Sequence, residues 1–266
     1  MAEDLEQVQT AAPAREPDRA DDAGEAPYQS RFQLLFGMLL GVGLAAIAAT
    51  VLVLSGTGRH SDNELGAATW APWQPSASNG LDAVKQIADH VGQRYTLPSG
   101  NQMVAVRGGN LDFAQLPITV VVQENGQERL FDQNGGVLYN MCGLGKNCSI
   151  KEGKATPARG VVTRREALEL ALYTFRYIKN VNQVVVILPP KPGSKPSYAM
   201  FYQRSDVGAS LDRPLSATLP GPPPVPPSVS KATQDAINQL TLPNLFSFTP
   251  RQGADAHIYF VLSPPK

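Results

Sequence analysis

The sequence predicts an α+β protein in which a single transmembrane helix is followed by an extracytoplasmic domain of antiparallel strands with about three helices. Three observations predict this class. Residues 34–54 form an apolar run without a charge. After this run, stretches with helical spacing of apolar residues alternate with short strand-like runs, in the order αβββ, αββ, αββ. Short turns join the strands, which favours antiparallel pairing with the helices on one face of the sheet.

Residues 1–31 are predicted to be a disordered tail. They are rich in Ala, Asp, Glu and Pro and contain few large apolar side chains, so they bury too little surface to offset their chain entropy. Arg15, Arg19 and Arg31 lie before the apolar run, whereas only Arg59 follows it closely. The positive-inside rule therefore predicts a cytoplasmic tail, with the C-terminal domain on the outer side of the cell membrane.

Residues 32–55 are predicted to be the transmembrane helix. The 21 residues of the apolar run, at about 1.5 Å per residue, cover the roughly 30 Å hydrocarbon core of a bilayer. A cleaved secretory signal would have an apolar core of about 7–15 residues near the start of the chain, so this run favours a permanent single-pass signal-anchor. Gly37 and Gly41 have the spacing found in helix dimers. A homodimer through this face and an ordinary glycine content are both open interpretations.

Residues 56–80 resemble a linker, because Gly, Ser and Pro occur throughout. Trp70 and Trp73 interrupt it, and they are predicted to lie either at the membrane interface or against the folded domain. The extracytoplasmic domain is predicted to span residues 81–266. Within it, residues 220–227 (PGPPPVPP) form an extended spacer that either separates two subdomains or crosses the surface of one.

The first helix of the domain is predicted to start at Leu81 and to end before the LPSG sequence at 97–100, since Pro and Gly both break helices. One face carries its apolar residues, which are Leu81, Val84, Ile87, Ala88 and Val91. His90 lies beside this face, and we interpret it as a surface or boundary residue rather than a catalytic base.

Strands are predicted at 102–107, 118–123 and 128–132. Asn125 and Gly126 lie between the last two, and these residue types supply the positive backbone angles of a tight hairpin. A central helix is predicted to start at a capping box formed by Thr163 and Glu166. Its apolar residues cover most of its circumference, so it should pack against neighbours in more than one direction.

The rest of the chain is predicted to contain strands at 184–188 and 198–203, a helix at 230–240, and two last strands at 245–249 and 257–262.

Cys142 and Cys148 are predicted to form a disulfide that closes a small Gly-rich loop, because disulfides persist outside the cytoplasm. A metal site would need further ligands at short spacing, but the three histidines (His60, His90 and His257) are scattered. We therefore expect no metal and no cofactor.

No sequence pattern marks a catalytic nucleophile or a zinc hydrolase, since both G-x-S-x-G and H-E-x-x-H are absent. A carboxylate pair for glycoside cleavage stays open, because such acids come from any part of a sequence. The acids considered for it are Asp112, Glu124, Glu166 and Glu169.

A basic segment supplies the candidate anion-binding residues. Against the single acid Glu152, it contains Lys146, Lys151, Lys154, Arg159, Arg164 and Arg165. In the predicted first turn of the central helix, Arg164 and Arg165 would oppose the helix dipole, and a bound anion would offset this cost. The segment is thus either a site for phosphate or carboxylate groups or a solvated basic loop.

These observations together predict a membrane-anchored protein of the bacterial cell envelope. Its outer domain is expected to bind or scaffold an anionic lipid, a wall polymer or an envelope protein. The alternative is an envelope enzyme that acts on wall polysaccharide or lipid through a carboxylate pair. The formal net charge is zero, which gives no basis for a nucleic-acid partner.

Overall fold

The computed structural model describes residues 70–77, 80–113, 116–142, 152–254 and 257–265. The predicted tail, transmembrane helix and most of the linker lie outside these ranges, so they stay predictions. Within these ranges, no helix is both long and apolar enough to cross a membrane.

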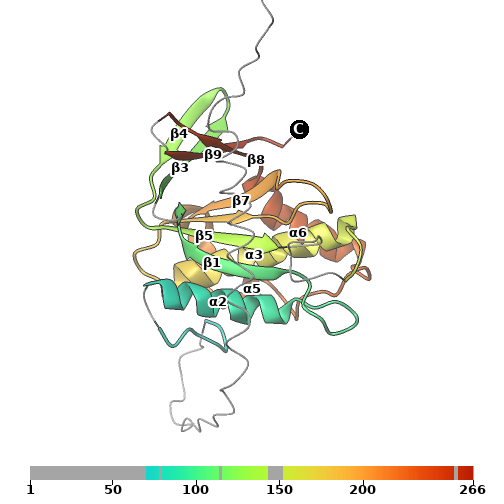
Figure 1. Cartoon of the computed structure of the whole chain (residues 1–266). Helices are drawn as coiled ribbons and strands as arrows, with labels where there is room; N and C mark the ends of the chain where they lie inside the picture. The colour runs from blue at the N-terminus through green and yellow to red at the C-terminus, as the bar shows by residue number, and fades with distance from the viewer. Residues whose placement is uncertain (1–69, 78–79, 114–115, 143–151, 255–256, 266) are drawn as a thin grey trace, which may run out of the picture.

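The described part of the chain is an α+β domain, as predicted (Figure 1). Its longer helices are α2 (Gly80–Arg94), α3 (Pro157–Tyr177) and α6 (Lys231–Thr241). Short helical segments are η2 (Arg204–Val207), α4 (Gly208–Leu211), α5 (Leu215–Thr218) and η3 (Leu242–Asn244). The strands are β1 (Ala105–Asn110), β2 (Asp112–Phe113), β3 (Leu116–Glu124), β4 (Gln127–Phe131), β5 (Gly136–Cys142), β6 (Gln183–Ile187), β7 (Tyr198–Gln203), β8 (Leu245–Gln252) and β9 (Ile258–Ser263).

The sheet is mixed, which corrects the prediction of purely antiparallel pairing. Its strand order is β1-β5-β6-β7-β8-β9-β3-β2, with β4 also paired to β3. Two pairs are parallel, β5 with β6 and β3 with β9. The first arises because helix α3 carries the chain back to the starting end of β5 before β6 begins, as in any βαβ crossover. The second joins strands that are far apart in sequence, so no short turn between them requires antiparallel pairing.

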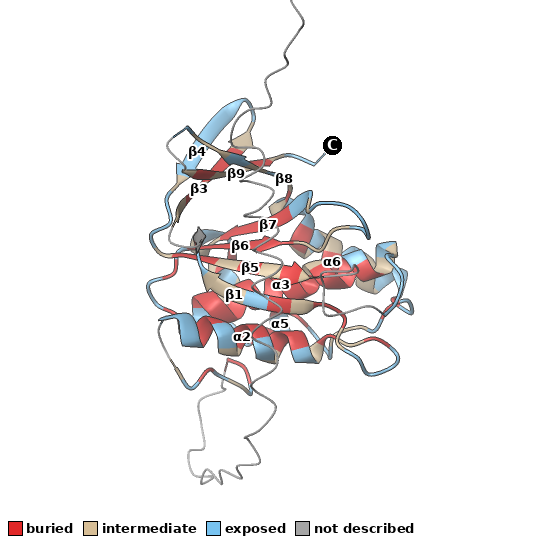
Figure 2. Ribbon diagram, in the orientation of Figure 1, coloured by how far each residue is buried: buried red, intermediate tan, exposed pale blue. Residues whose placement is uncertain are grey.

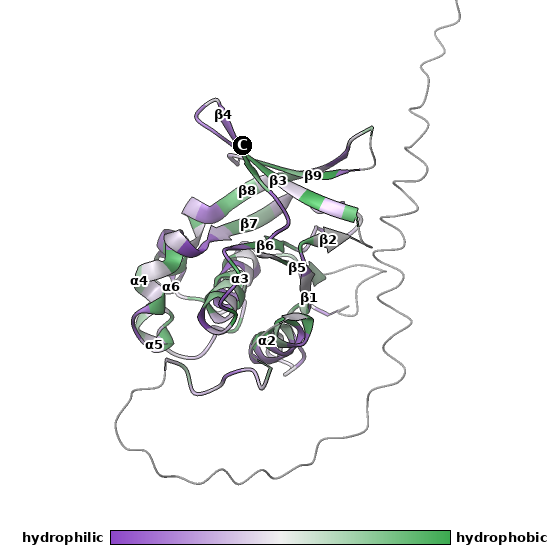
Figure 3. Cartoon of the chain, turned by 90° about the vertical axis from the view of Figure 1, so that its left-hand side faces the viewer, coloured by the Kyte–Doolittle hydropathy of each residue, from purple (hydrophilic) through white to green (hydrophobic). Residues whose placement is uncertain are grey.

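The sheet curls back on itself. Strands β1 and β2 stand at opposite ends of the strand order, yet only Leu111 separates them in sequence. Figure 3 shows the resulting bend, with β8, β9 and β3 passing over the sheet face that points away from the helices.

Strands β6 and β7 are buried on both faces because of this curl. Alternate residues point to opposite sides of a strand, so Val184 and Val186 pack in the cluster beneath the helices. Val185 and Ile187 pack in a second cluster inside the curl, together with Phe201 of β7. Figure 2 shows the buried strands and the buried central helix α3.

Helix α3 begins earlier than predicted, so the Thr163 capping box is wrong. Pro157 occupies the first turn, and Thr156 is the N-cap, whose Oγ1 accepts from the backbone N–H of Arg159 at 3.2 Å. Thr163 is buried and its hydroxyl donates to the carbonyl of Arg159 at 2.8 Å, one turn back. Glu166 is likewise inside the helix.

Both tryptophans dock onto the domain, which settles the two alternatives for them. Trp70 is buried, and its ring lies 5.3 Å from that of Tyr173. Trp73 stacks on His90 with ring centroids 3.9 Å apart. His90 is half-buried, the boundary position that we predicted. By contrast, Leu81 is 40% exposed and does not belong to the buried face of α2.

The Pro-rich stretch crosses one surface of the domain and does not separate two subdomains. Strand β8 follows it and pairs with β7, which precedes it. The carbonyl of Gly221 also accepts a hydrogen bond from Arg165 of α3 at 3.1 Å.

Candidate functional site

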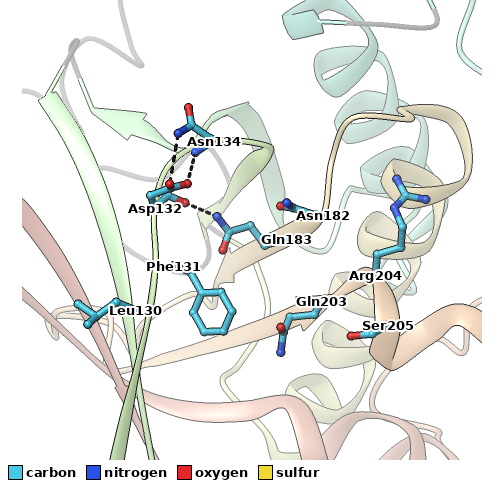
Figure 4. Close-up of a pocket in the computed structure, with 9 residues that line it drawn as sticks. All are labelled: Leu130, Phe131, Asp132, Asn134, Asn182, Gln183, Gln203, Arg204 and Ser205. Atoms are coloured by element: carbon cyan, nitrogen blue, oxygen red, sulfur yellow. Dashed lines mark hydrogen bonds between the residues drawn. The ribbon is translucent and has the colours of Figure 1, made fainter.

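A cavity of about 460 Å³ lies between the end of β4 and the paired ends of β6 and β7 (Figure 4). Nine residues line it, and we call this site the carboxamide pocket: Leu130, Phe131, Asp132, Asn134, Asn182, Gln183, Gln203, Arg204 and Ser205. Its volume falls within the range of about 300–1,000 Å³ that is usual for ligand sites.

The turn after β4 forms one wall of the pocket. Asp132 Oδ1 accepts a hydrogen bond from the backbone N–H of Asn134 at 2.9 Å, which is an Asx-turn. Gly135 follows with a φ of 65°, and a Cβ on it would lie 2.7 Å from the carbonyl oxygen of Asn180. Glycine therefore lets this turn approach the loop between α3 and β6. A hydrogen bond of 2.9 Å from Asn182 N–H to the Gly135 carbonyl joins the two segments.

Four carboxamide side chains supply most of the polar groups of the pocket: Asn134, Asn182, Gln183 and Gln203. Gln183 is only 4% exposed, and its Nε2 donates to the carbonyl of Asp132. Its Oε1 is buried and has no hydrogen-bond partner among the described residues. Leaving such an acceptor unsatisfied costs about 1–3 kcal/mol. A donor from a ligand or a water would offset this cost.

The apolar part of the wall comes from the end of β4. The Phe131 ring points into the pocket (Figure 4) and lies 5.1 Å from the ring of Phe201. Leu130 is 67% exposed. The pocket thus combines an aromatic surface with carboxamides that both donate and accept.

Arg204 lies on the rim, and each of its three side-chain nitrogens already donates to a main-chain carbonyl. Nε donates to the carbonyl of Val181 at 2.9 Å and Nη2 to that of Ile178 at 2.8 Å. Nη1 donates to the carbonyl of Phe175, and the guanidinium lies 5.3 Å from the Phe175 ring. This arginine therefore binds the end of α3 to the end of β7, and the remaining polar lining is neutral apart from Asp132.

The three predicted anion-binding arginines that the structure describes each have hydrogen-bond partners within the domain. Arg159 is buried and donates to the carbonyls of Glu152 and Met103. Arg164 donates to Thr241 Oγ1 at 3.3 Å and to Asn238 Oδ1.

Arg165 is also buried, and it donates to Tyr95 Oη at 2.7 Å. Arg164 and Arg165 lie about two turns inside α3 and not in its first turn. They therefore do not oppose the helix dipole at the N-terminus, and this reason for expecting a bound anion no longer applies. Lys154 is exposed, whereas Lys146 and Lys151 lie outside the described residues. A shared anion site at these residues stays a prediction.

Two of the acids considered for catalysis are buried in α3. Glu169 forms ion pairs with Arg94 and Arg165 and accepts from Tyr95 Oη at 2.7 Å. Glu166 is fully buried, and neither carboxyl oxygen has a hydrogen-bond partner in the described part of the chain. Burial, and secondarily the charge of Glu169, raises the pKa of Glu166 well above its usual range.

Neither acid lines the carboxamide pocket. Glu124 pairs with Arg129 at 3.0 Å on the surface, and nothing is described of the Asp112 side chain. No accessible carboxylate pair is therefore formed by the three candidate acids whose side chains are described.

Cys142 is the last residue of β5, but Cys148 lies outside the described residues, so the disulfide stays a prediction. Within the described ranges, no group of three His, Cys, Asp or Glu residues is placed to hold a metal ion.

Comparison of the chain with protein-family models, with curated proteins and with solved structures finds no match. The function must therefore be argued from the geometry of the domain itself.

Sequence reasoning missed the carboxamide pocket. Its residues come from three segments, around 130–134, 182–183 and 203–205. A signal was present in the sequence, because Asn and Gln recur in DQNGG (132–136) and NVNQ (180–183). Only the fold shows that these two segments are neighbours.

Proposed function

We propose that this chain is a membrane-anchored envelope protein whose outer domain binds a neutral polar ligand in the carboxamide pocket. Residues 34–54 are the proposed anchor, with the N-terminus in the cytoplasm. The observation that carries the proposal is Gln183, a buried carboxamide with its nitrogen satisfied, its oxygen unpartnered and a cavity beside it. Native interiors seldom leave such atoms without a partner.

The charges of the pocket favour a neutral ligand over an anionic one. An anion would need a free cation, and Arg204 already donates to main-chain carbonyls. Asp132 adds a negative charge at the rim. The anionic partner expected from the basic segment would have to bind elsewhere, and the three arginines described there have intramolecular partners.

The enzyme alternative draws no support from the described residues. Glu166 and Glu169 are enclosed in the helix layer, away from the pocket, and Glu169 is paired with two arginines. A glycosidase needs an acid and a base on either side of an accessible bond.

The pocket is tested with the full chain in lipid nanodiscs, by co-sedimentation with purified insoluble wall polymer from the source cells. Replacing Asn182 and Gln203 together by Ala should weaken binding about fivefold or more, since two lost hydrogen bonds are worth about 0.5–1.5 kcal/mol each. Both side chains are at least partly exposed, so the fold should tolerate the change.

Gln93→Ala is the matched control, because Gln93 is an exposed carboxamide on α2 outside the pocket. It should bind as the unmodified chain does. Equal binding by the double variant, or no binding by the unmodified chain, would overturn the pocket as the ligand site. Release of the chain from the membrane fraction by salt alone would contradict the anchor.

A further inference from the structure

A second cavity, of about 360 Å³, adjoins the carboxamide pocket. Asn134 lines both cavities. The second cavity is lined on one side by the turn after β4 and on the other by the loop that follows α3. It adds three more carboxamide residues to the lining: Asn110, Gln133 and Asn180.

The two cavities lie on either side of the contact between those segments. At this contact, the Gly135 carbonyl accepts from Asn182 N–H, and Gly135 has no room for a Cβ against the Asn180 carbonyl. The loop contributes Asn180 to one cavity and Asn182 to the other. A ligand that crosses this contact would therefore meet carboxamides in both cavities.

The chemistry of the lining favours carbohydrate. A carboxamide has two donor hydrogens and an acceptor oxygen, which match the adjacent hydroxyl groups of a sugar ring. The Phe131 ring in the first cavity provides an apolar surface for the C–H side of such a ring. Among the described residues that line the two cavities, Arg204 is the only cation and Asp132 the only acid. An uncharged polymer therefore fits better than a charged one.

An extended peptide is the nearest rival, because its backbone also donates and accepts. Peptides, however, are usually bound by strand addition, in an apolar groove, or through charged groups. The first cavity is lined mainly by polar side chains, and the second combines four carboxamide residues with glycines and small aliphatic residues, with no charged residue. These observations favour the glycan.

We infer that the two cavities form one groove for a linear, neutral polysaccharide, with successive sugar units on either side of the contact at Gly135. This inference rests on the proposed function, since it assigns a ligand class to the carboxamide pocket and extends the site to the second cavity.

The test is calorimetric titration of the full chain in nanodiscs with linear neutral oligosaccharides of one to six units. Three series serve as probes: α-1,4-glucans, β-1,4-glucans and β-1,4-mannans. For at least one series, affinity should rise about tenfold or more with length and then level off once both cavities are filled.

Two double variants distinguish the contributions of the two cavities to binding. Asn110→Ala with Asn180→Ala, both exposed side chains of the second cavity, should remove the gain with length and keep the affinity for short oligosaccharides. Asn182→Ala with Gln203→Ala should weaken binding at every length. Gln93→Ala should change neither.

The outcomes distinguish this inference from the proposed function. Affinity that does not depend on length, with short oligosaccharides still bound in the carboxamide pocket, overturns the shared groove and leaves the pocket standing. Binding of wall polymer that depends on Gln203, with no affinity for any of the three series, overturns the neutral glycan. Equal or tighter binding of an uncharged Gly/Ser peptide also overturns it.

Discussion

At the scale of single residues, Gly135 allows the close contact between the turn after β4 and the loop after α3. Its φ of 65° is disfavoured for other residues, and a Cβ would meet the Asn180 carbonyl at 2.7 Å. Gly135→Ala should lower the free energy of unfolding by about 2 kcal/mol or more, from backbone strain and steric overlap together. Denaturation in urea measures this change.

Gly193→Ala is the control for Gly135→Ala. Gly193 has a φ of 78° but no atom within 4 Å of the added Cβ, so it carries the backbone strain without the overlap. It should cost only about 1 kcal/mol. Equal losses for the two variants would show that the close approach at Gly135 contributes nothing.

Glu166 gives the domain a pH dependence. Burial raises its pKa above that of the unfolded chain, so the folded state keeps the carboxyl protonated where the unfolded state ionises. The unfolded chain then binds fewer protons, and stability falls as the pH rises above about 4.5. Glu166→Gln mimics the protonated acid and removes this loss.

The stability of Glu166→Gln relative to the unmodified chain should therefore rise between pH 4 and pH 7, with a slope of up to about 1.4 kcal/mol per pH unit. Urea denaturation at three pH values measures it. Glu128→Gln, on the exposed strand β4, is the control for the effect of a Glu-to-Gln substitution on the surface. A stability difference for Glu166→Gln that stays constant with pH would mean that the acid is ionised in the folded domain.

At the scale of elements, Arg204 joins the end of α3 to the sheet. Its planar guanidinium donates to the carbonyls of Phe175, Ile178 and Val181, at the end of helix α3 and in the loop that follows it. Lysine has the charge but not the fork of donors. Arg204→Lys should lower the free energy of unfolding by about 2 kcal/mol or more, as measured in urea.

Arg176→Lys is the comparison for Arg204→Lys. Arg176 is exposed at the same end of α3, where it donates a hydrogen bond of 3.3 Å to the Leu211 carbonyl. Its replacement should change stability by no more than about 0.5 kcal/mol. If both variants behaved alike, the hydrogen bonds of Arg204 would not stabilise the junction.

Elements with local signals could be predicted from the sequence. The Asn125-Gly126 turn has the positive φ angles of 53° and 75° that its residue types predict, and β7 has the predicted bounds. Helix α6 begins after its Ser230 cap, whose Oγ accepts from Thr233 N–H at 3.1 Å. In each case the residues that determine the element are neighbours in the chain.

Other elements depend on contacts that are distant in sequence. Helix α3 begins after Thr156 and not at the predicted Thr163, and only burial in the fold shows that Thr163 lies inside the helix. Strand β5 was missed, because its pairing with β1 and β6 joins segments that are distant in sequence. The first strand was predicted three residues too early at each end.

At the scale of the whole molecule, the curl of the sheet creates the candidate site. It brings the end of β4 to face β6 and β7, so that the ring of Phe131 lies 5.1 Å from the ring of Phe201. No spacing in the sequence could reveal this arrangement, because it depends on the parallel pairing of β3 with β9 and on the closure from β1 to β2. The candidate site is therefore a property of the topology, and the motifs found in the sequence lie elsewhere.

The docking of Trp70 also limits how far the domain can travel. Between the proposed anchor, which ends at residue 54, and Trp70 lie 15 residues, and such a length spans at most about 50 Å when fully extended. Since Trp70 is buried in the core, the residues after it belong to the folded domain and cannot extend this connection. The domain would therefore stay close to the membrane surface, and its ligand would be the wall polymer that lies nearest to the bilayer.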